Sequence, residues 1–250
     1  MPQPFLTARW SDLVFLTFEV PEDRVVAVIP PGVAPDHWHG HAHVTLVALR
    51  MDDVRIAGWR VPGFGSHSQV NLRTYVRGPR HPRAPALAPG VAFVRQLVPS
   101  RLIAAVARVR FGEPFRAAAV EAHVTATDDA VHVEYRFGLA RPSNRIAVAG
   151  SRRARPPMPG TLEQHLIERR LGWRADRRGR LRSFRVDRDA WAVRDVRAVE
   201  YDIDFAALYG TEWGFLNGAP AVSTILAVGS DVAVYQSSVI SHQSSIISPQ

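Results

Sequence analysis

Lysine and cysteine are both missing from this 250-residue chain, in which all 31 basic residues are arginine. Without lysine, the chain has no side-chain amine with which to form a Schiff base on a carbonyl compound. Without cysteine, disulfides, thiolate nucleophiles and cysteine–metal sites are excluded as well. Lysine-imine and thiol chemistry are therefore ruled out for any pocket that the chain forms.

Sequence features of secretion and membrane insertion are also lacking. Arg9, Asp12 and Glu19 interrupt the N-terminal segment, whereas a signal peptide has an unbroken apolar stretch. An uncharged segment at 213–230 is broken by glycine, asparagine and proline, which indicates a loop leading into a strand and not a membrane helix. We therefore expect a cytoplasmic protein without membrane contact.

The positive charge is concentrated in one part of the chain. Residues 151–200 hold 14 arginines and 7 acidic residues, so they carry +7 of the total charge of +8. A basic segment of this kind can contact phosphates. However, acidic residues are interleaved with the arginines, and aromatic residues are not placed to stack on bases. A solvated helix and hairpin is therefore favoured over a nucleic-acid interface.

Apolar residues make up 46% of the chain, which is enough for a substantial core. Their spacing predicts roughly ten short strands and only three helices. Neither an internal repeat nor a sharp break in composition divides the sequence, so we expect one domain over 1–250 with a polar tail at 237–250. The predicted fold class is α+β, mainly β: a closed mixed β-barrel with a few short helices at its ends.

The same patterns predict where individual elements lie. The apolar run 5–20 predicts a strand buried on both faces. Thr161 followed by Gln164 predicts a capped helix over 162–173. Two further helices are predicted at 22–29 and 99–110, and further strands at 41–50, 54–60, 91–97, 181–186, 193–203, 221–228 and 232–235.

Residues 67–77 show the clearest two-residue alternation in the chain. One face carries Val70, Leu72, Thr74 and Val76, and the other carries Gln69, Asn71, Arg73 and Tyr75. A barrel that encloses a ligand presents alternate residues inward, so the polar face is our candidate pocket wall. The alternative is that this face is solvated and only the apolar face is core.

A second alternating segment, 115–138, predicts a hairpin that turns at Asp128-Asp129. With a two-residue loop, His123 lies opposite Glu134 and Glu121 opposite Arg136. The first pair has the composition of a general base and its orienting partner. The alternative is a solvent-facing cross-strand pair worth under about 1 kcal/mol.

Four histidines alternate near a predicted turn, at His37, His39, His41 and His43, beside Asp36. Period-two spacing places neighbours on one strand face, where they could share a metal ion. Side chains around a turn are usually exposed, however, and such a loop needs no metal. We favour the solvated loop and expect no metal.

Several motifs, in order along the chain, resemble the YqjF-like family of uncharacterised bacterial proteins (domain of unknown function 2071). The most specific is the segment 71–76, Asn-Leu-Arg-Thr-Tyr-Val. The resemblance extends over about residues 5–205 and implies an acetoacetate-decarboxylase-like β-barrel. The other matching segments are 8–13, 29–32 with Asp36 and Gly40, 107–108, 111–115, 160–163, 167–170 and Trp191.

The resemblance also bears on the reaction. In the decarboxylases, a Gly-x-Pro-Lys-Lys motif supplies the Schiff-base lysine, and the matching stretch here is Gly112-Glu113-Pro114-Phe115-Arg116. Phe115 therefore stands at the nucleophile position and cannot form an imine. Gln69 matches the decarboxylase glutamate, and Arg188 matches a histidine that is usual in the family. The resemblance thus implies the barrel and its pocket but not the decarboxylase mechanism.

Two functions fit these observations. One is an enzyme that binds a small oxo- or carboxylate-bearing molecule and acts as a lyase, hydratase, isomerase or cyclase without a covalent imine. The other is a non-catalytic ligand-binding or sensor protein. The chain lacks a phosphate-binding glycine loop and we expect no cofactor, while a homodimer is left open. The candidate catalytic residues are Arg73, Gln69, Arg116, His123 and Glu134, and the candidate ligand-binding residues are Asn71, Tyr75, Phe115 and Glu113.

Overall fold

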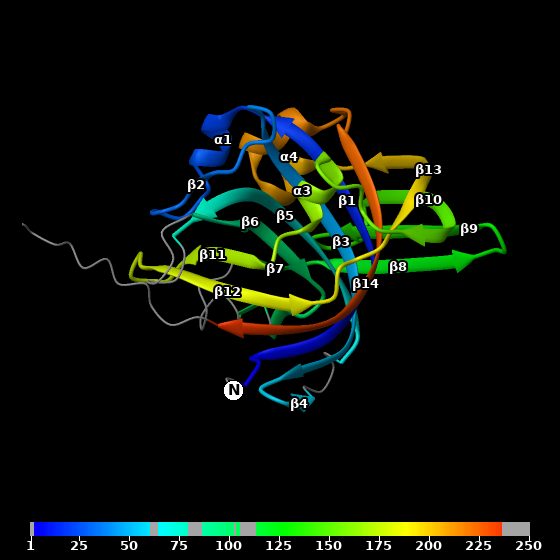
Figure 1. Ribbon diagram of the computed structural model, residues 1–250, viewed down its shortest axis with the longest axis horizontal. Coiled ribbons are helices and arrows are strands. Elements are labelled where there is room, and N and C mark those ends of the chain that lie inside the picture. Colours follow the sequence, from blue (N-terminus) through cyan, green and yellow to red (C-terminus); the bar gives the residue numbers. More distant parts are fainter. Residues whose placement is uncertain (1–2, 61–64, 80–86, 103, 106–113, 237–250) are drawn as a thin grey trace, which may run out of the picture.

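A computed structural model describes residues 3–60, 65–79, 87–102, 104–105 and 114–236 (Figure 1). Its helices are short: α1 (Glu22–Val26), α3 (Leu162–Ile167), α4 (Phe205–Tyr209) and the 3₁₀ helix η1 (Thr211–Leu216). The strands are β1 (Leu6–Val20), β2 (Ala34–Pro35), β3 (Ala42–Ile56), β4 (Trp59–Arg60), β5 (His67–Gly78), β6 (Ala88–Val98), β7 (Phe115–Ala117), β8 (Ala119–Ala126), β9 (Ala130–Gly138), β10 (Asn144–Arg155), β11 (Leu171–Ala175), β12 (Leu181–Arg188), β13 (Val193–Asp202) and β14 (Ser223–Gln236).

Seven strands close into a ring. They pair in the order β1-β3-β5-β6-β11-β12-β14, and β14 pairs back onto β1. All of these pairs are antiparallel except β6 with β11, which is parallel. The expected closed mixed β-barrel with a few short helices is thus confirmed.

A second sheet branches from the barrel at β14. Strands β13, β10, β9 and β8 follow one another on this branch and lie to one side of the barrel in Figure 1. Their apolar side chains, such as Val133 and Ile146, form one core with Leu16, Leu46 and Leu72 of the barrel wall. The barrel strands β1, β3 and β5 therefore separate two apolar layers.

Strand β1 shows how this arrangement arises from the sequence. Leu16 and Phe18 face the second sheet, whereas Phe15 faces the barrel core, and all three are at most 1% exposed. A strand covered on both faces needs an unbroken apolar run and not an alternating one. The prediction for 5–20 is confirmed.

Strand β5 divides its two faces as predicted. Val70 and Leu72 pack against the second sheet, while Tyr75 belongs to the core inside the barrel. Arg73 lies on the same face as Tyr75, because its guanidinium stacks on the ring of Phe15 in that inner core. The polar face of this strand is therefore turned into the barrel and not toward solvent.

The helix predicted over 162–173 ends earlier than expected. Helix α3 stops at Ile167, and the residues after it form strand β11, which pairs with β6 and β12. Thr161 does cap the helix, accepting from the backbone N–H of Gln164. The residues after Ile167 pair as a strand and do not continue the helix, because β11 closes the barrel. The ring of Phe184 lies directly over Gly172 in this strand.

Two other predicted divisions are wrong. The segments 41–50 and 54–60 are separate only in sequence pattern: β3 runs on to Ile56, and Asp53 takes a positive φ of 51° within it. Likewise, the strands predicted at 221–228 and 232–235 form one strand, β14, which begins at Ser223, because Gly229 at φ 90° lets it continue where a Cβ would strike Trp10 O. Of the helix predicted at 99–110, only 101–102 and 104–105 lie among the helical residues described, and the tail 237–250 lies outside them.

We predict that Gly172→Ala destabilises the barrel. An added Cβ would lie 1.9 Å from Phe184 Cζ, so the ring or β11 must shift. Overpacking of this kind costs about 1–3 kcal/mol in free energy of unfolding, which urea denaturation measures. The matched control is Gly65→Ala, where a Cβ meets nothing within 4 Å. Equal stability of the two variants would contradict the close packing at this strand.

Candidate functional site

One row of side chains crosses the inside of the barrel. Phe15 pairs with Val47, and Val47 pairs with Asn71. Asn71 pairs in turn with Gln96, and Gln96 with Phe115. Cross-strand partners share one face of a sheet, and for Phe15 and Val47 that face is the inner core. Asn71 and Phe115 therefore both lie on the inner face, with Gln96 between them.

Arg73 enters the same interior from the neighbouring position on β5. Its Cζ lies 5.1 Å from the centre of the Phe15 ring, and its Nη2 donates to Leu166 O at 3.2 Å. Its Nε is buried without a hydrogen-bond partner among the described residues, and so is Asn71 Oδ1. Buried polar atoms are rarely left unpaired. The two groups thus have unused hydrogen-bonding capacity inside the barrel.

Arg188 reaches the same region from β12. Its side chain is 1% exposed, its Nη2 donates to Ile167 O at 2.8 Å, and its Cζ lies 3.8 Å from the centre of the Trp191 ring. Burial lowers the pKa of Arg188 to about 10, which still leaves it a cation at neutral pH. Arg73 and Arg188 therefore hold the last carbonyls of α3, where cations are favoured.

Tyr75 is the centre of a buried polar group beside Arg73. Its hydroxyl lies 2.7 Å from Thr45 Oγ1, which in turn lies 2.9 Å from Thr17 Oγ1. The guanidinium carbons of Arg73 and Arg169 lie 5.8 and 5.4 Å from its ring centre. We use the name Tyr75 cluster for Tyr75 and the ionisable side chains around it, which are Asp36, His43, Arg73, His165 and Arg169.

A buried ion pair holds one side of the Tyr75 cluster. Asp36 Oδ2 lies 2.7 Å from Arg169 Nη1, and their side chains are only 1% and 5% exposed. Arg77, which is half-exposed, donates through Nε to the other carboxylate oxygen at 2.6 Å. Removing either buried partner would leave an uncompensated charge. The pair therefore fixes the end of β2 and the chain after α3 against β5.

Two histidines of the cluster have a bare ring nitrogen. His43, on the inner face of β3, is 4% exposed and its Nδ1 has no partner among the described residues. His165 Nε2 is in the same state, and its ring lies 5.0 Å from that of Trp38 and 5.7 Å from that of Tyr75. His165 is not among the residues predicted from sequence, and His43 was expected in an exposed loop. The alternation of His43 with Thr45 and Val47 is the signal that places it inward.

Burial keeps both histidines neutral near pH 7. It lowers the pKa of His165 to about 4, helped by the charge of Arg169 and opposed by that of Asp36. Burial also lowers the pKa of His43, against the attraction of Glu19. A neutral imidazole with a free nitrogen can accept a proton. The Tyr75 cluster therefore combines cations that can bind an anion with groups that can take up a proton.

The hairpin candidates lie elsewhere. The register pairs His123 with Glu134 and Glu121 with Arg136, as predicted. However, His123 is exposed, and Glu134 is held by Arg136 and Arg145 at 2.6 and 2.7 Å. The hydrogen bond from Arg145 is the largest cause that lowers the pKa of Glu134. This ladder lies on the face of the second sheet turned away from the barrel, apart from the Tyr75 cluster.

The remaining predicted residues are divided between the two faces. Gln69 is half-buried on the inner face of β5, two residues before Asn71. Arg116 pairs with Leu97, a residue of the core between the sheets, and is exposed, so it points away from the face of Phe115. The structure does not bring Arg116 to Arg73. Glu113 lies outside the described residues.

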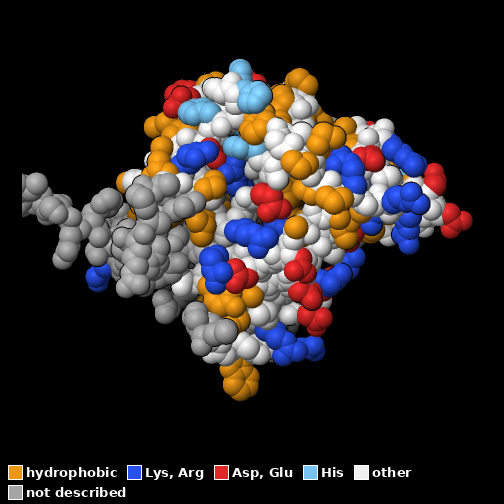
Figure 2. Space-filling view, viewed as in Figure 1, with side chains coloured by type: hydrophobic (Ala, Val, Ile, Leu, Met, Phe, Trp, Pro, Cys, Tyr) orange, Lys and Arg blue, Asp and Glu red, His pale blue; other side chains and the backbone are white. Residues whose placement is uncertain are grey.

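The histidines around the turn gather near α1 and β2, at the top of the molecule in Figure 2. His37 lies 3.4 Å from Glu22, and His41 lies 2.5 Å from Glu19. Within the described ranges, no three histidine or acidic side chains are grouped so as to hold a metal ion. The expectation that all four histidines are exposed is wrong for His43, because β3 begins just before it and carries it inward.

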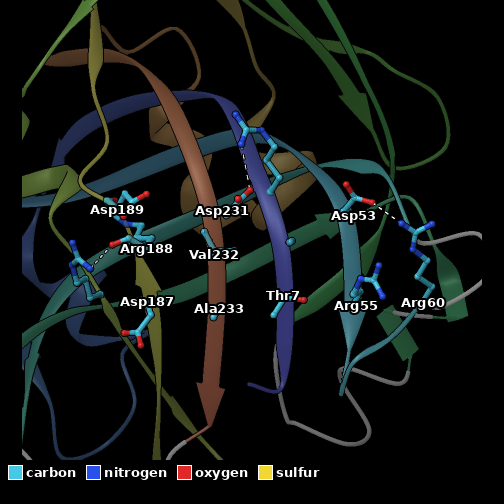
Figure 3. Close-up of a pocket in the computed structure, with 13 residues that line it drawn as sticks. Thr7, Asp53, Arg55, Arg60, Asp187, Arg188, Asp189, Asp231, Val232 and Ala233 are labelled. Atoms are coloured by element: carbon cyan, nitrogen blue, oxygen red, sulfur yellow. Dashed lines mark hydrogen bonds and ion pairs between the residues drawn. The ribbon is translucent and has the colours of Figure 1, made fainter. Parts of the chain in front are cut away.

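An open hollow with a volume of about 790 Å³ lies on the outside of the barrel (Figure 3). Its floor is shallow because small side chains, Ala233 and Thr7, pair at its centre, with Asp187 and Arg55 as the next partners on either side. Charges of both signs line it, including the ion pair of Arg60 with Asp53 at 3.0 Å. Such exposed pairs contribute little to stability. In contrast to this open hollow, the Tyr75 cluster is buried.

The arginine-rich segment 151–200 is largely paired within the molecule. Arg155 contacts Glu163 and Asp195 at 2.8 and 2.7 Å, and Arg180 and Arg182 share Asp176. These ion pairs involve the acidic residues that are interleaved with the arginines in the sequence. No described helix has the length and apolar character needed to cross a membrane.

Comparison with known proteins identifies the family. The model of DUF2071, an uncharacterized conserved protein family, matches residues 7–231. The chain belongs to this family. No curated protein is significantly similar to it.

The chain has the fold of acetoacetate decarboxylases. The chain is similar to the acetoacetate decarboxylase of Legionella pneumophila, with a TM-score of 0.62, 13% identity, and coverage of 96% of this chain and 88% of that one. It is also similar to the enduracididine biosynthesis enzyme MppR complexed with pyruvate, with a TM-score of 0.60, 12% identity, and coverage of 96% and 92%. An acetoacetate decarboxylase-like enzyme from Sphingomonas wittichii matches with a TM-score of 0.57, 13% identity, and coverage of 95% and 94%. At these identities the likeness establishes the fold.

We predict that His165 makes the protein sensitive to acid. The unfolded chain takes up a proton on this histidine near pH 6.5, whereas the folded protein does so only near pH 4. The unfolded state therefore binds more protons over this range, and stability falls as the pH is lowered from about 6.5 to 4. Urea denaturation of wild type and His165→Gln across this range measures the effect. The variant should lose less stability on acidification, and an unchanged pH dependence would contradict the burial of a neutral His165.

Proposed function

We propose that the barrel of this protein binds a small molecule with a carboxylate or oxo group and acts on it without a lysine imine. The observation that carries the proposal is that Arg73 Nε and Asn71 Oδ1, two positions apart on the inner face of β5, are both buried and unpaired among the described residues. A guanidinium is suited to carboxylate and carbonyl oxygens. An amide oxygen beside it can orient a donor on the same ligand.

The nature of the inner face supports this proposal. The interior is not wholly apolar, since the Tyr75 cluster places cations and two neutral histidines beside the core. Phe115 stands in the row with Asn71, so an apolar ring occupies the position that resembles the imine-forming lysine. Small-molecule sites are typically apolar with a few convergent polar groups. A non-catalytic ligand-binding protein is the second candidate, because neither Phe115 nor Gln69 can exchange a proton.

We expect Arg73→Gln to weaken binding of pyruvate, the simplest 2-oxo acid probe for this site. A hydrogen bond to a charged group contributes about 1.5–3 kcal/mol, so affinity should fall roughly ten- to a hundredfold. Isothermal titration calorimetry measures the dissociation constant. Arg185→Gln is the control, because Arg185 is a half-exposed arginine of β12 that pairs with Asp187 at the surface.

Thermal unfolding of both variants separates loss of the site from loss of the fold. If Arg73→Gln is folded and binds pyruvate as tightly as Arg185→Gln does, the assignment of Arg73 to the ligand is wrong. If the wild type itself does not bind pyruvate, the proposed function fails.

The orientation of Phe115 gives an independent test. Phe115→Lys would place an amine on the inner face, so it should form an imine with pyruvate that borohydride reduces to a stable adduct. Arg116→Lys would place the same amine on the exposed face, one residue away, where no ligand is held. Intact-protein mass spectrometry should show an adduct for the first variant and none for the second. Equal labelling of the two would contradict an inward-facing ligand site.

A further inference from the structure

We propose that His165 takes a proton from, and returns it to, the carbon next to the oxo group of a small 2-oxo acid held by Arg73. This inference rests on the proposed function and assigns it a reaction and an acid–base group. Neither histidine of the Tyr75 cluster was among the catalytic or ligand-binding candidates selected from sequence. The proposal therefore adds a residue to the site rather than a role for one already chosen.

Helix α3 places His165 and the ligand-binding arginine around the same ring. Arg73 donates to Leu166 O, which belongs to the residue directly after His165. Both side chains contact Tyr75: the His165 ring is 5.7 Å and the Arg73 Cζ 5.8 Å from its ring centre. A ligand that contacts the Tyr75 ring between these two side chains would therefore be within reach of both groups.

Packing leaves one nitrogen of His165 available for this role. Trp38 and Tyr75 hold its ring, while Nε2 is buried and has no hydrogen-bond partner among the described residues. A core histidine with a purely structural role usually has its nitrogens paired. His43, which is 4% exposed and also has a bare nitrogen, lies close enough to influence it electrostatically. Unpaired buried nitrogens on two adjacent histidines indicate a place that a ligand completes.

The charges around His165 favour its neutral form. The titratable groups that act on it are Arg169 on the chain after α3, Arg77 on β5, His43 on β3 and Asp36 at β2. Burial, the two arginines and His43 all disfavour the imidazolium, and only Asp36 favours it. A neutral imidazole can act as a base, and the imidazolium formed in this setting is a strong acid that returns its proton readily.

The proposed step balances without a co-reactant. The C–H bond next to the oxo group breaks and its proton goes to Nε2 of His165. The electron pair of that bond forms the carbon–carbon double bond of an enolate, while the carbonyl electron pair moves onto oxygen. Arg73 or Arg169 stabilises the negative oxygen electrostatically. Return of a proton from His165, after exchange with water, restores the 2-oxo acid.

Proton NMR of pyruvate in D₂O tests the step, because the methyl signal decays as its protons exchange for deuterium. We expect the wild type to speed this decay over protein-free buffer. His165→Gln keeps a polar side chain but cannot take up a proton, so it should slow the exchange roughly a hundredfold or more, with pyruvate affinity by calorimetry largely retained. His132→Gln, which changes an exposed histidine of β9, is the control and should exchange as the wild type does.

The outcomes separate this inference from the proposed function. If the wild type binds pyruvate without exchanging it, or if His165→Gln exchanges it as fast as the wild type, the inference is wrong while the binding proposal stands. If the wild type does not bind pyruvate, the proposed function fails and the inference with it. Thermal unfolding confirms that each variant is folded.

The pH profile of the wild type provides a readout that needs no variant. Since only neutral His165 is a base, the exchange rate should stay level from pH 7 down to about pH 5 and fall near pH 4, following the lowered pKa of this histidine. A rate that falls near the ordinary value of 6.5, or does not fall at all, would contradict the assignment.

Discussion

The structure depends on one constraint: strands β1, β3 and β5 form a wall that must be covered on both sides. One side packs against the second sheet through residues such as Leu16 and Leu72, and the other faces the inside of the barrel. Burial of the outer side supplies apolar area of the kind that dominates folding free energy. That outer layer is almost wholly apolar and holds the three strands in place. Their inner side can therefore carry polar residues such as Arg73 and Asn71. The inner site is thus built on strands whose position is set from behind.

Polar groups inside a barrel are costly unless they are satisfied, and α3 satisfies several of them. At the end of this helix, the carbonyl of Leu166 accepts from Arg73, and that of Ile167 accepts from Arg188 in addition to the backbone N–H of Arg169. The same contacts hold two guanidinium groups inward in fixed positions. The helix and the arginines therefore depend on each other: the helix end needs donors, and the arginines need acceptors. Arg73 Nε, His43 Nδ1 and His165 Nε2 remain unpaired among the described residues, so these atoms can still form hydrogen bonds.

The sequence predicts the strand faces well and the division of the inner site poorly. Alternation in 67–77 and the continuous apolar run of 5–20 each report burial directly, so both faces of β5 and the double burial of β1 could be read from local pattern. The extent of α3 could not, because Gly172 is taken into the barrel by pairing with distant β6 and β12. The same limit applies to the contacts of Arg169 with Asp36 and of His165 with Tyr75, which form only because α3 and the chain after it pack against β2 and β5. Arg116 was assigned to the site because it follows Phe115 in the motif. Neighbouring residues of a strand point to opposite faces, however, so Arg116 faces away from the interior that Phe115 faces.

The lack of lysine acquires a structural meaning through the position of Phe115. Phe115 lies on the inner face beside Gln96, at the position that resembles the imine-forming lysine of the decarboxylase motif. A phenyl ring at this position cannot act as a nucleophile. The arginines of the interior cannot replace the lysine, because an arginine stays protonated and is not a nucleophile at neutral pH. They can, however, hold an anion and stabilise charge that develops on an oxygen. Neutral histidines are the nearby groups that can take up a proton, and this combination is the basis of the proposed non-covalent proton transfer next to a bound carbonyl.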